Sequence, residues 1–235
     1  MTHTDFHSHI LPCVDDGSAS VEESLAMLRL EAEQGVKHVV ATPHFYPRYD
    51  TPEQFLARRE QAMAQLREAM AAEPGLPEIT LGAEVYFFRG MSESDVLSQL
   101  TFGQKRCILI EMPFGSWTTE MYRELEELRT RRGFLPIVAH VDRYIRPFHT
   151  HGIPQRLAEL PVLVQANTEF FLDRRTSAMA MRMLKADAIQ LLGTDCHNLT
   201  SRRPDMAQAL EKIQKKLGPC VMERLEMHES NLWNA

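Results

Sequence analysis

Two histidines near the start of the sequence stand at a spacing that suits metal binding. The run HTDFHSHILPCVDDGS, residues 3–18, holds three histidines, three aspartates and few side chains that could build a core. His7 and His9 alternate within it, and alternate side chains of an extended strand leave on the same face. Two imidazoles side by side on one face indicate a metal site.

Similar polar residues recur near the ends of later apolar runs. Imidazoles and carboxylates mixed in this way suit manganese, iron or zinc. The candidate ligands, five histidines and four carboxylates, are His7, His9, Asp16, His44, Glu84, Glu111, His140, Asp195 and His197. Nine ligands are too many for one ion and fit about three divalent ions with some carboxylate bridging. About three such ions (+6) against four carboxylates (−4) leave +2, so the site would attract an anion.

The prediction depends on the whole set, because a lone buried histidine is more often a core residue with satisfied hydrogen bonds than a ligand. Glu84 and Glu111 support the set, since each places a carboxylate at the end of an apolar strand. An unpaired charge is costly there, and a cation would offset the cost. Five other histidines lack such a placement and are expected at the surface or behind the ligands: His3, His38, His149, His151 and His228.

Seven runs rich in branched residues must position these ligands. They alternate with helical patterns, which is typical of βαβ units and a parallel sheet. The predicted strands cover residues 3–9, 36–44, 78–86, 107–112, 135–140, 161–167 and 188–195. Six of them end in or just before a candidate ligand, and the run 161–167 offers Asn167 instead.

Residues that begin and end helices separate the strands. Ser20 followed by Glu23 is the pattern of a capping box, and Gly35 suits the left-handed position after that helix. Three further helices are expected to begin at Thr51, Thr118 and Pro204.

The placement of the polar residues decides between an open sheet and a barrel. An α/β barrel gathers its active site at the C-terminal ends of its strands, whereas an open doubly wound sheet gathers ligands near one switch point. Polar groups at nearly every strand end therefore predict an α/β fold, a distorted (β/α)7 barrel of the TIM type. No repeat, low-complexity tract or linker interrupts the sequence, so residues 1–235 are expected to form a single domain.

Composition narrows the class of protein. A hydrophobic fraction of 44% and a charged fraction of 25% are typical of a globular protein with a sizeable core. The formal net charge of −6 argues against a nucleic-acid or anionic-membrane partner, because both favour a basic surface. No apolar run suggests a membrane span or a signal peptide, so a cytoplasmic location is expected. The four cysteines form no CxxC pair, and reduced thiols are expected.

Six segments together resemble a known family: DFHSHILPCVDDGS, ATPH, GAEVY, LIEMP, AHVDRY and GTDCHNLTSRRP. In this order and spacing they are similar to the PHP (polymerase and histidinol phosphatase) superfamily. Within it they most resemble the bacterial tyrosine-protein phosphatases encoded beside capsule and exopolysaccharide genes. The resemblance extends from Asp5 to about Met206, and it implies the PHP variant of the TIM-like fold.

The resemblance implies three divalent metal ions, with Mn²⁺ expected and iron or zinc as alternatives. In the implied arrangement one ion takes His7, His9, Glu84 and Asp195, a second shares Glu84 and takes Glu111 and His140, and a third takes Asp16, His44 and His197. Arg143 and Arg202 match arginines that family members use on the phosphate, a role that suits the bidentate guanidinium group.

Four features depart from the family pattern. Cys13 stands where the family often has glycine, Phe45 follows His44 where a polar residue is common, and Asp142 replaces a usual glutamate. The segment RPFHTHGIP also differs from the expected loop. These departures bear on substrate preference more than on metal binding.

The resemblance and the ligand set together predict metal-assisted hydrolysis of a phosphomonoester, phosphotyrosine on a protein. A hydroxide bridging two ions would attack phosphorus, since coordination lowers the pKa of bound water toward neutrality. The ions and both arginines would stabilise charge on the equatorial oxygens. The resemblance implies as partner the tyrosine-rich tail of a bacterial tyrosine kinase, whose regulation would adjust polysaccharide export.

Three alternatives stay open at the level of sequence. Cys196 and Arg202 satisfy C-x5-R, the spacing of cysteine-dependent tyrosine phosphatases, although CHNLTSR lacks the glycine that gives such a loop its positive backbone angles. The same ions could serve a small phosphomonoester such as histidinol phosphate, or an amide bond. A metal-stabilised module could instead bind phosphopeptides with little catalysis.

Overall fold

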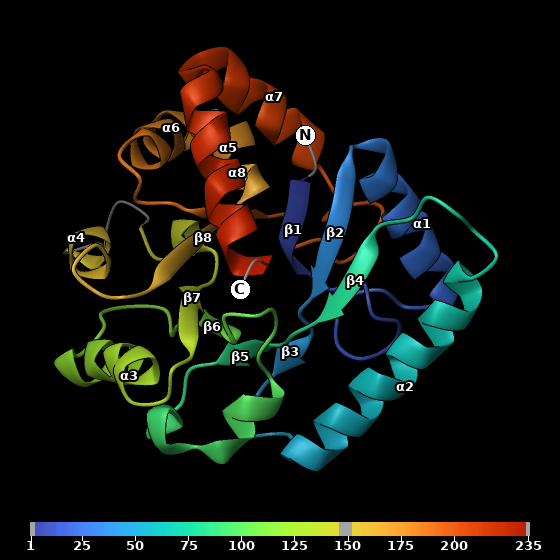
Figure 1. The fold of residues 1–235 in the computed structure, drawn as a ribbon, viewed down its shortest axis with the longest axis horizontal. Helices are drawn as coiled ribbons and strands as arrows, with labels where there is room; N and C mark the ends of the chain where they lie inside the picture. Colours follow the sequence, from blue (N-terminus) through green and yellow to red (C-terminus); the bar gives the residue numbers. More distant parts are fainter. Residues whose placement is uncertain (1–2, 146–151, 234–235) are drawn as a thin grey trace.

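The computed structural model describes residues 3–145 and 152–233, whose parallel strands curl into a distorted barrel surrounded by helices (Figure 1). The strands are β1 (His3–Ser8), β2 (Val36–Ala41), β3 (His44–Phe45), β4 (Glu78–Leu81), β5 (Glu84–Tyr86), β6 (Cys107–Glu111), β7 (Leu135–Val138), β8 (Leu163–Asn167) and β9 (Leu191–Gly193). They form one sheet of order β1-β2-β4 and another of order β3-β5-β6-β7-β8-β9. All seven predicted strand regions are confirmed.

Two of the predicted strands are each divided in two. Pro43, which cannot donate a backbone hydrogen bond, separates β2 from β3, and Gly82 separates β4 from β5. A Cβ atom on Gly82 would lie 3.0 Å from the Phe102 ring, so glycine allows a close approach there. Beyond these breaks His44 pairs in register with Glu84, which brings two candidate ligands side by side.

The first and last strands close the barrel. Ser8 and Cys196 form a parallel bridge, the His9 N–H donates to the Cys196 carbonyl at 2.9 Å, and the Asp195 N–H donates to the His7 carbonyl at 2.7 Å. The histidines of β1 therefore lie directly beside the residues that follow β9.

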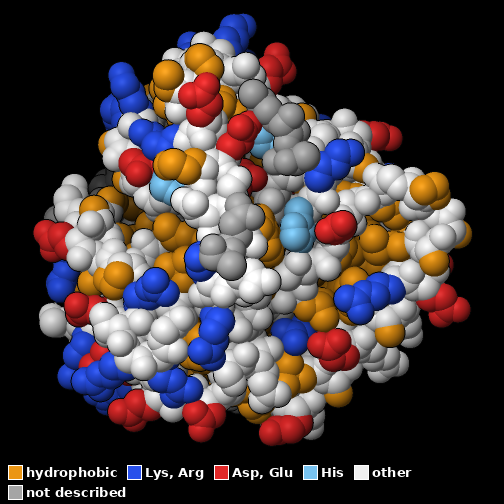
Figure 2. Space-filling model, in the orientation of Figure 1, with side chains coloured by type: hydrophobic (Ala, Val, Ile, Leu, Met, Phe, Trp, Pro, Cys, Tyr) orange, Lys and Arg blue, Asp and Glu red, His pale blue; other side chains and the backbone are white. Residues whose placement is uncertain are grey.

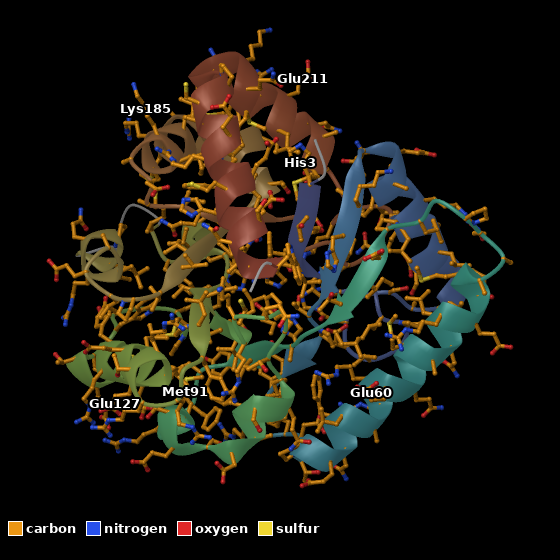
Figure 3. The ribbon with its side chains drawn as sticks, in the orientation of Figure 1. His3, Glu60, Met91, Glu127, Lys185 and Glu211 are labelled. Atoms are coloured by element: carbon orange, nitrogen blue, oxygen red, sulfur yellow. The ribbon has the colours of Figure 1, made fainter. Side chains whose placement is uncertain are left out.

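Helices cover the outside of the barrel (Figure 1). They are α1 (Val21–Glu33), α2 (Pro52–Met70), α3 (Thr119–Thr130), α4 (Ile153–Leu157), α5 (Thr168–Leu172), α6 (Ser177–Lys185), α7 (Met206–Leu217) and α8 (Pro219–Trp233). Short 3₁₀ turns cover Met91–Glu93, Asp95–Gln99 and Val141–Arg143. Glu60, Lys185 and Glu211 extend outward from these helices (Figure 3).

The predicted helix starts are confirmed in three of four cases. Thr51 and Thr118 cap α2 and α3, and Ser20 accepts the Glu23 N–H at 3.2 Å, although the Glu23 carboxylate accepts from Ala19 rather than from Ser20. The prediction that Pro204 opens a helix is wrong, since α7 begins at Met206.

The side chain of Gln34 explains the later start of α7. It donates to the Pro204 carbonyl at 2.9 Å and accepts the Ala207 N–H at 3.0 Å, so it fixes the chain before the helix begins.

Two apolar layers hold the fold together. One fills the barrel interior with side chains from five strands, Phe6, Val40, Leu109, Ile137 and Leu191. The other, larger layer lies between the strands and the surrounding helices. The candidate ligands lie above the interior layer, at the C-terminal ends of the strands.

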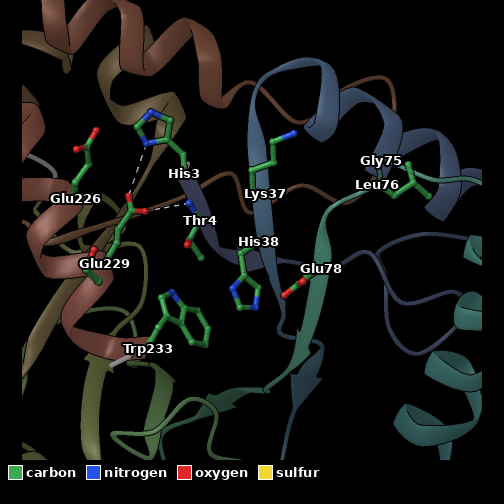
Figure 4. Close-up of a pocket in the computed structure, with 11 residues that line it drawn as sticks. His3, Thr4, Lys37, His38, Gly75, Leu76, Glu78, Glu226, Glu229 and Trp233 are labelled. Carbon is green, nitrogen blue, oxygen red and sulfur yellow. Dashed lines mark hydrogen bonds and ion pairs between the residues drawn. The ribbon is translucent and has the colours of Figure 1, made fainter. Parts of the chain in front are cut away.

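Helix α8, which the sequence analysis did not identify, covers the opposite end of the barrel. Trp233 stacks on His38 with ring centroids 4.1 Å apart, and a cavity of about 650 Å³ opens beside them (Figure 4). His3 lies there as well, 4.0 Å from Glu229, which accepts the Thr4 N–H at 3.0 Å. His3 and His38 therefore lie far from the candidate metal ligands, as expected.

Acidic and basic side chains are interspersed over the visible face of the molecule (Figure 2). No helix among the described residues is long and apolar enough to cross a membrane. The four cysteines are free thiols, in agreement with the sequence analysis.

Candidate metal centre

All nine candidate ligands lie in one cluster at the C-terminal ends of the strands. Each of them has a ring nitrogen or carboxylate oxygen within 4.0 Å of another member. Eight are buried or nearly so, and Asp16, in the loop after β1, has a side chain that is 69% exposed. Residues separated by up to 190 positions (197 − 7) thus share one site.

His7, His9 and Asp195 offer donor atoms that all lie within 4.8 Å of one another, and Glu84 adjoins both histidines. His7 Nε2 lies 3.1 Å from His9 Nε2, and each nitrogen lies 3.2–3.5 Å from Glu84 Oε2 and Asp195 Oδ1. Donors about 2.1 Å from a tetrahedral ion lie about 3.4 Å from one another. The separations of each histidine nitrogen from the other and from both carboxylates therefore fit ligands of a divalent cation.

Glu84 is the central carboxylate of the cluster. It is buried, and no donor in the described part of the chain is aligned for a hydrogen bond to its Oε2 atom. Its Oε1 lies 2.6 Å from His140 Nε2, and its Oε2 lies 2.9 Å from His44 Nδ1. Burial would raise the pKa of Glu84, but His7 and His140 hold it well below its usual value. Glu84 is thus an ionised carboxylate with a buried oxygen directed at neighbouring donors.

Asp16 lies beside two histidines in a second group. Asp16 Oδ1 is 3.5 Å from both His44 Nε2 and His197 Nε2, and the latter atom is buried with no hydrogen-bond partner among the described residues. Burial, with His9 nearby, lowers the pKa of His197 to about 4. The imidazole is therefore neutral at pH 7, as a metal ligand must be.

Glu111 and His140 complete the cluster on the side of β6 and β7. Their closest atoms lie 3.9 Å apart, and donor atoms of His44, Glu84 and Glu111 all lie within 4.8 Å of one another. His44 consequently adjoins both this group and the group around Asp16.

Left-handed backbone at three positions shapes the site. His140 and Asp195 have φ angles of 31° and 53°, which are uncommon for residues with a Cβ atom and are often found at functional sites. Cys13 also has a positive φ, 58°, and its N–H donates to the Ser18 carbonyl at 2.8 Å. Cys13 thus adopts a conformation that glycine would favour, and the loop toward Asp16 forms without glycine.

Three residues that were not predicted as ligand partners contact the ligands. Asp15 Oδ2 lies 2.7 Å from the ring nitrogen Nδ1 of His9. Gln165 accepts the backbone N–H of His140 at 2.6 Å, and the Asn167 side chain donates to Asp195 at 2.9 Å. Gln165 and Asn167 alternate in β8, as His7 and His9 do in β1, and that alternation was a usable signal.

We predict that Asp15→Asn weakens Mn²⁺ binding by about 10- to 100-fold. The Asp15 carboxylate accepts from His9 Nδ1–H and so directs the lone pair of Nε2 toward the metal donors. Calorimetric titration of the metal-free protein with Mn²⁺ measures this effect. Asp95→Asn is the matched control, since Asp95 is exposed and forms a salt bridge with Arg132. Equal affinities for both variants would contradict the role of Asp15.

Two arginines face the cluster from neighbouring loops. Arg143 and Arg202 both bind Asp195 Oδ2, the latter at 2.7 Å. They line a cavity of about 260 Å³ that also includes Asn167 and Asp195. Their positive charges therefore lie directly beside the candidate ligands.

The C-x5-R reading fails on the position of its cysteine. Cys196 is fully buried, on the side of the strand that faces Asp5 and Glu31. Burial and these two carboxyl groups raise the pKa of the Cys196 thiol well above its usual value. Cys196 is thus neither exposed nor ionised as a nucleophile must be.

The buried pair of Asp5 and Glu31 lies behind the metal centre. Asp5 accepts the N–H groups of His7 and Thr194 at 3.0 and 2.9 Å, whereas both Glu31 oxygens lack a hydrogen-bond donor among the described residues. Burial, and then the charge of Asp5, raise the pKa of Glu31 well above 4.5. Glu31 is therefore the protonated member of the pair.

Glu31→Gln is expected to raise the free energy of unfolding by about 1–2 kcal/mol at pH 8. The folded protein retains a Glu31 proton that the unfolded chain releases above pH 4.5, so stability falls as pH rises from that value toward the folded pKa. Glutamine keeps a donor for Asp5 and removes this pH dependence of stability. Urea unfolding of both metal-free proteins from pH 5 to 9 measures the free energy of unfolding. Identical pH slopes for the two proteins would exclude a protonated Glu31.

The remaining histidines lie outside the cluster. His228 on α8 binds Asp187 at 3.0 Å, while His149 and His151 fall outside the described residues, as does most of the RPFHTHGIP segment.

Comparison with known proteins identifies close relatives. The family described as "Capsular polysaccharide synthesis, CpsB/CapC" matches residues 3–232. The chain is 30% identical over 224 residues to the tyrosine-protein phosphatase CpsB of Streptococcus pneumoniae, covering 91% of this chain and 90% of the relative. It is 26% identical over 222 residues to the tyrosine-protein phosphatase YwqE of Bacillus subtilis (strain 168), covering 91% and 85%.

A solved structure shares the fold. It comes from work on YwqE of Bacillus subtilis and CpsB of Streptococcus pneumoniae, described there as unique metal-dependent tyrosine phosphatases. The TM-score is 0.81 with 23% sequence identity, over 97% of this chain and 92% of the other. This likeness confirms the predicted barrel.

Proposed function

The chain belongs to the CpsB/CapC family of capsular polysaccharide synthesis, and on this premise we propose that it is a metal-dependent protein-tyrosine phosphatase. Its relatives CpsB and YwqE are named as tyrosine-protein phosphatases. The observation that carries the proposal is that His7 Nε2 and His9 Nε2 lie 3.1 Å apart and 3.2–3.5 Å from carboxylate oxygens of Glu84 and Asp195, with two arginines beside them. Residues 1–235 act as one catalytic domain in this proposal.

The proposed centre holds about three divalent ions, with Mn²⁺ expected. The proposed ligand sets are His7, His9, Glu84 and Asp195; Glu84, Glu111 and His140; and Asp16, His44 and His197. When bound, the ions supply an activated water at neutral pH and offset the charge of a phosphate. The ionised Glu84 and the neutral His197 support this proposal, because both are in the protonation state that metal binding requires.

The residues around the centre have separate tasks in the proposed reaction. Arg143 and Arg202 hold the phosphate oxygens and stabilise the charge that develops on them. Asp15 keeps the His9 imidazole in its binding orientation, and Gln165 does so for the His7 imidazole, whose Nδ1 lies 3.3 Å from Gln165 Oε1. The phenol of phosphotyrosine has a pKa near 10 and is a good leaving group, so the chemistry favours aryl phosphates.

The proposed substrate is the phosphorylated, tyrosine-rich tail of a bacterial tyrosine kinase, which would place the reaction in the cytoplasm. Dephosphorylation of that tail would adjust capsule or exopolysaccharide export. The family description supports the link to capsule export, since it names capsular polysaccharide synthesis.

The test combines metal analysis of the purified protein with a phosphotyrosine-peptide assay before and after chelation. We expect about three ions per chain, loss of phosphate release with chelator, and recovery on addition of Mn²⁺. Cys196→Ser should retain activity, because Cys196 faces away from the ligands. Phosphate release that survives chelation, or faster turnover of histidinol phosphate than of the peptide, would contradict the proposal.

A further inference from the structure

A second cavity with an aromatic wall adjoins the metal centre. It has a volume of about 480 Å³ and lies between the loop after β1 and the loop after β3. Asp16 and His44 line it and also belong to the cluster of candidate ligands. The cavity is therefore next to the position that a phosphate at the metal centre would occupy. Its size is within the usual range for small-ligand sites.

Tyr46 forms the inner part of the aromatic wall. Its hydroxyl lies 3.2 Å from His44 Nδ1 and donates to Glu111 Oε2 at 3.4 Å. Its ring packs against Tyr86 with centroids 5.6 Å apart. These contacts hold the Tyr46 ring beside the ligands at a fixed angle.

Tyr49 forms the outer part of the wall and is 79% exposed. A backbone turn fixes its position, since the N–H groups of Tyr49 and Asp50 donate to the Tyr46 carbonyl at 2.9 and 3.1 Å. The two tyrosine rings meet edge to face, with centroids 6.5 Å apart and an interplanar angle of 68°. Asp50 in turn binds Arg58 of α2, which anchors the turn. The Arg48 guanidinium carbon lies over the Tyr49 ring, 5.8 Å from its centroid, and the rest of this largely exposed ring is open on an anchored loop.

The cavities beside the cluster differ in chemistry. One contains Arg143 and Arg202, whose guanidinium groups suit phosphate oxygens. The other contains Tyr46 and Tyr49, whose rings suit a flat aromatic group. An aryl phosphate has both of these parts joined by one ester oxygen, so it matches the pair of cavities.

We infer that the cavity lined by Tyr46 and Tyr49 is the subsite for the phenyl ring of the substrate, and that Tyr49 gives the site a preference for aryl over alkyl phosphates. This inference rests on the proposed phosphatase function and names the residues that select its substrate. The occupant is the side-chain ring of phosphotyrosine, which would cover the exposed face of Tyr49.

Calorimetric binding of two phosphonates to the Mn²⁺-loaded protein tests the inference without catalysis. Phenylphosphonate and methylphosphonate carry the same charged group and differ in the ring. The wild type should bind phenylphosphonate about tenfold more tightly, roughly the contribution of one aromatic contact. Tyr49→Ala should remove most of this preference and leave methylphosphonate affinity unchanged, whereas Tyr49→Phe should retain the preference.

Phe114→Ala is the matched control, because Phe114 is a 69% exposed aromatic residue in the loop after β6 and does not line this cavity. It should leave the preference intact. Equal affinity of the wild type for both phosphonates, or a preference lost in Phe114→Ala but kept in Tyr49→Ala, would overturn the inference alone. Failure of the wild type to bind either phosphonate would overturn the phosphate site of the proposed function as well.

Discussion

Glu84→Gln is expected to lower turnover of a phosphotyrosine peptide by at least about 10³-fold. Glu84 is buried among four histidines, and no donor in the described parts of the chain is aligned for a hydrogen bond to one of its oxygens. Glutamine is nearly the same size but neutral, and it places an amide among the imidazoles. It removes a negative charge that the proposed arrangement shares between two ions, so metal content should fall together with activity.

Turnover and metal content measured on the same preparation check this expectation, and circular dichroism shows whether the variant is folded. Glu60→Gln is the matched control, because Glu60 is an exposed carboxylate on α2. A folded Glu84→Gln protein with full metal content and activity within tenfold of the wild type would refute the assignment of Glu84.

Loss of either arginine beside the cluster should have the next largest effect. Arg143→Ala and Arg202→Ala are each expected to lower kcat/KM for the peptide by about 10²- to 10³-fold. Each removes a positive donor that lies beside Asp195 at the edge of the metal centre. Metal content should stay unchanged, since neither residue can serve as a ligand, and inhibition by inorganic phosphate should weaken.

Lysine at the same positions should restore only part of the activity, because an ammonium group cannot make the paired contacts of a guanidinium group. Arg89→Ala, which removes an exposed arginine paired with Glu120, serves as control. Activity within threefold of the wild type in both arginine variants would show that other groups hold the phosphate.

Much of the barrel could be predicted because its strands are apolar and its ligands are not. Each run such as the one ending at Glu111 combines a continuous buried stretch with a polar terminus, and that contrast is visible without coordinates. The same contrast identified eight of the nine residues that the structure brings together, while Asp16 came from the loop after the first strand, and the cap at Ser20 is equally local.

The features that were missed depend on contacts between distant segments. The Phe102 ring lies close to Gly82, and the side chain of Gln34 binds the chain on both sides of the start of α7. The tasks of Asp15 and Gln165 follow from where His9 and His7 come to lie. The alternation of Gln165 and Asn167 marks both side chains in the sequence, but no local pattern identifies the partner in any of these contacts, so the partners required the structure.

Closure of the barrel by its first and last strands has a consequence for the order of events during synthesis. His7 and Asp195 meet only after the strand that precedes Asp195 has been made, because 188 positions separate them. Pairing over so long an interval is slow. During synthesis His7 therefore remains without Asp195 until that residue has been added. In the proposed metal centre, an ion that takes both His7 and Asp195 would consequently bind only after the C-terminal third of the protein has been made.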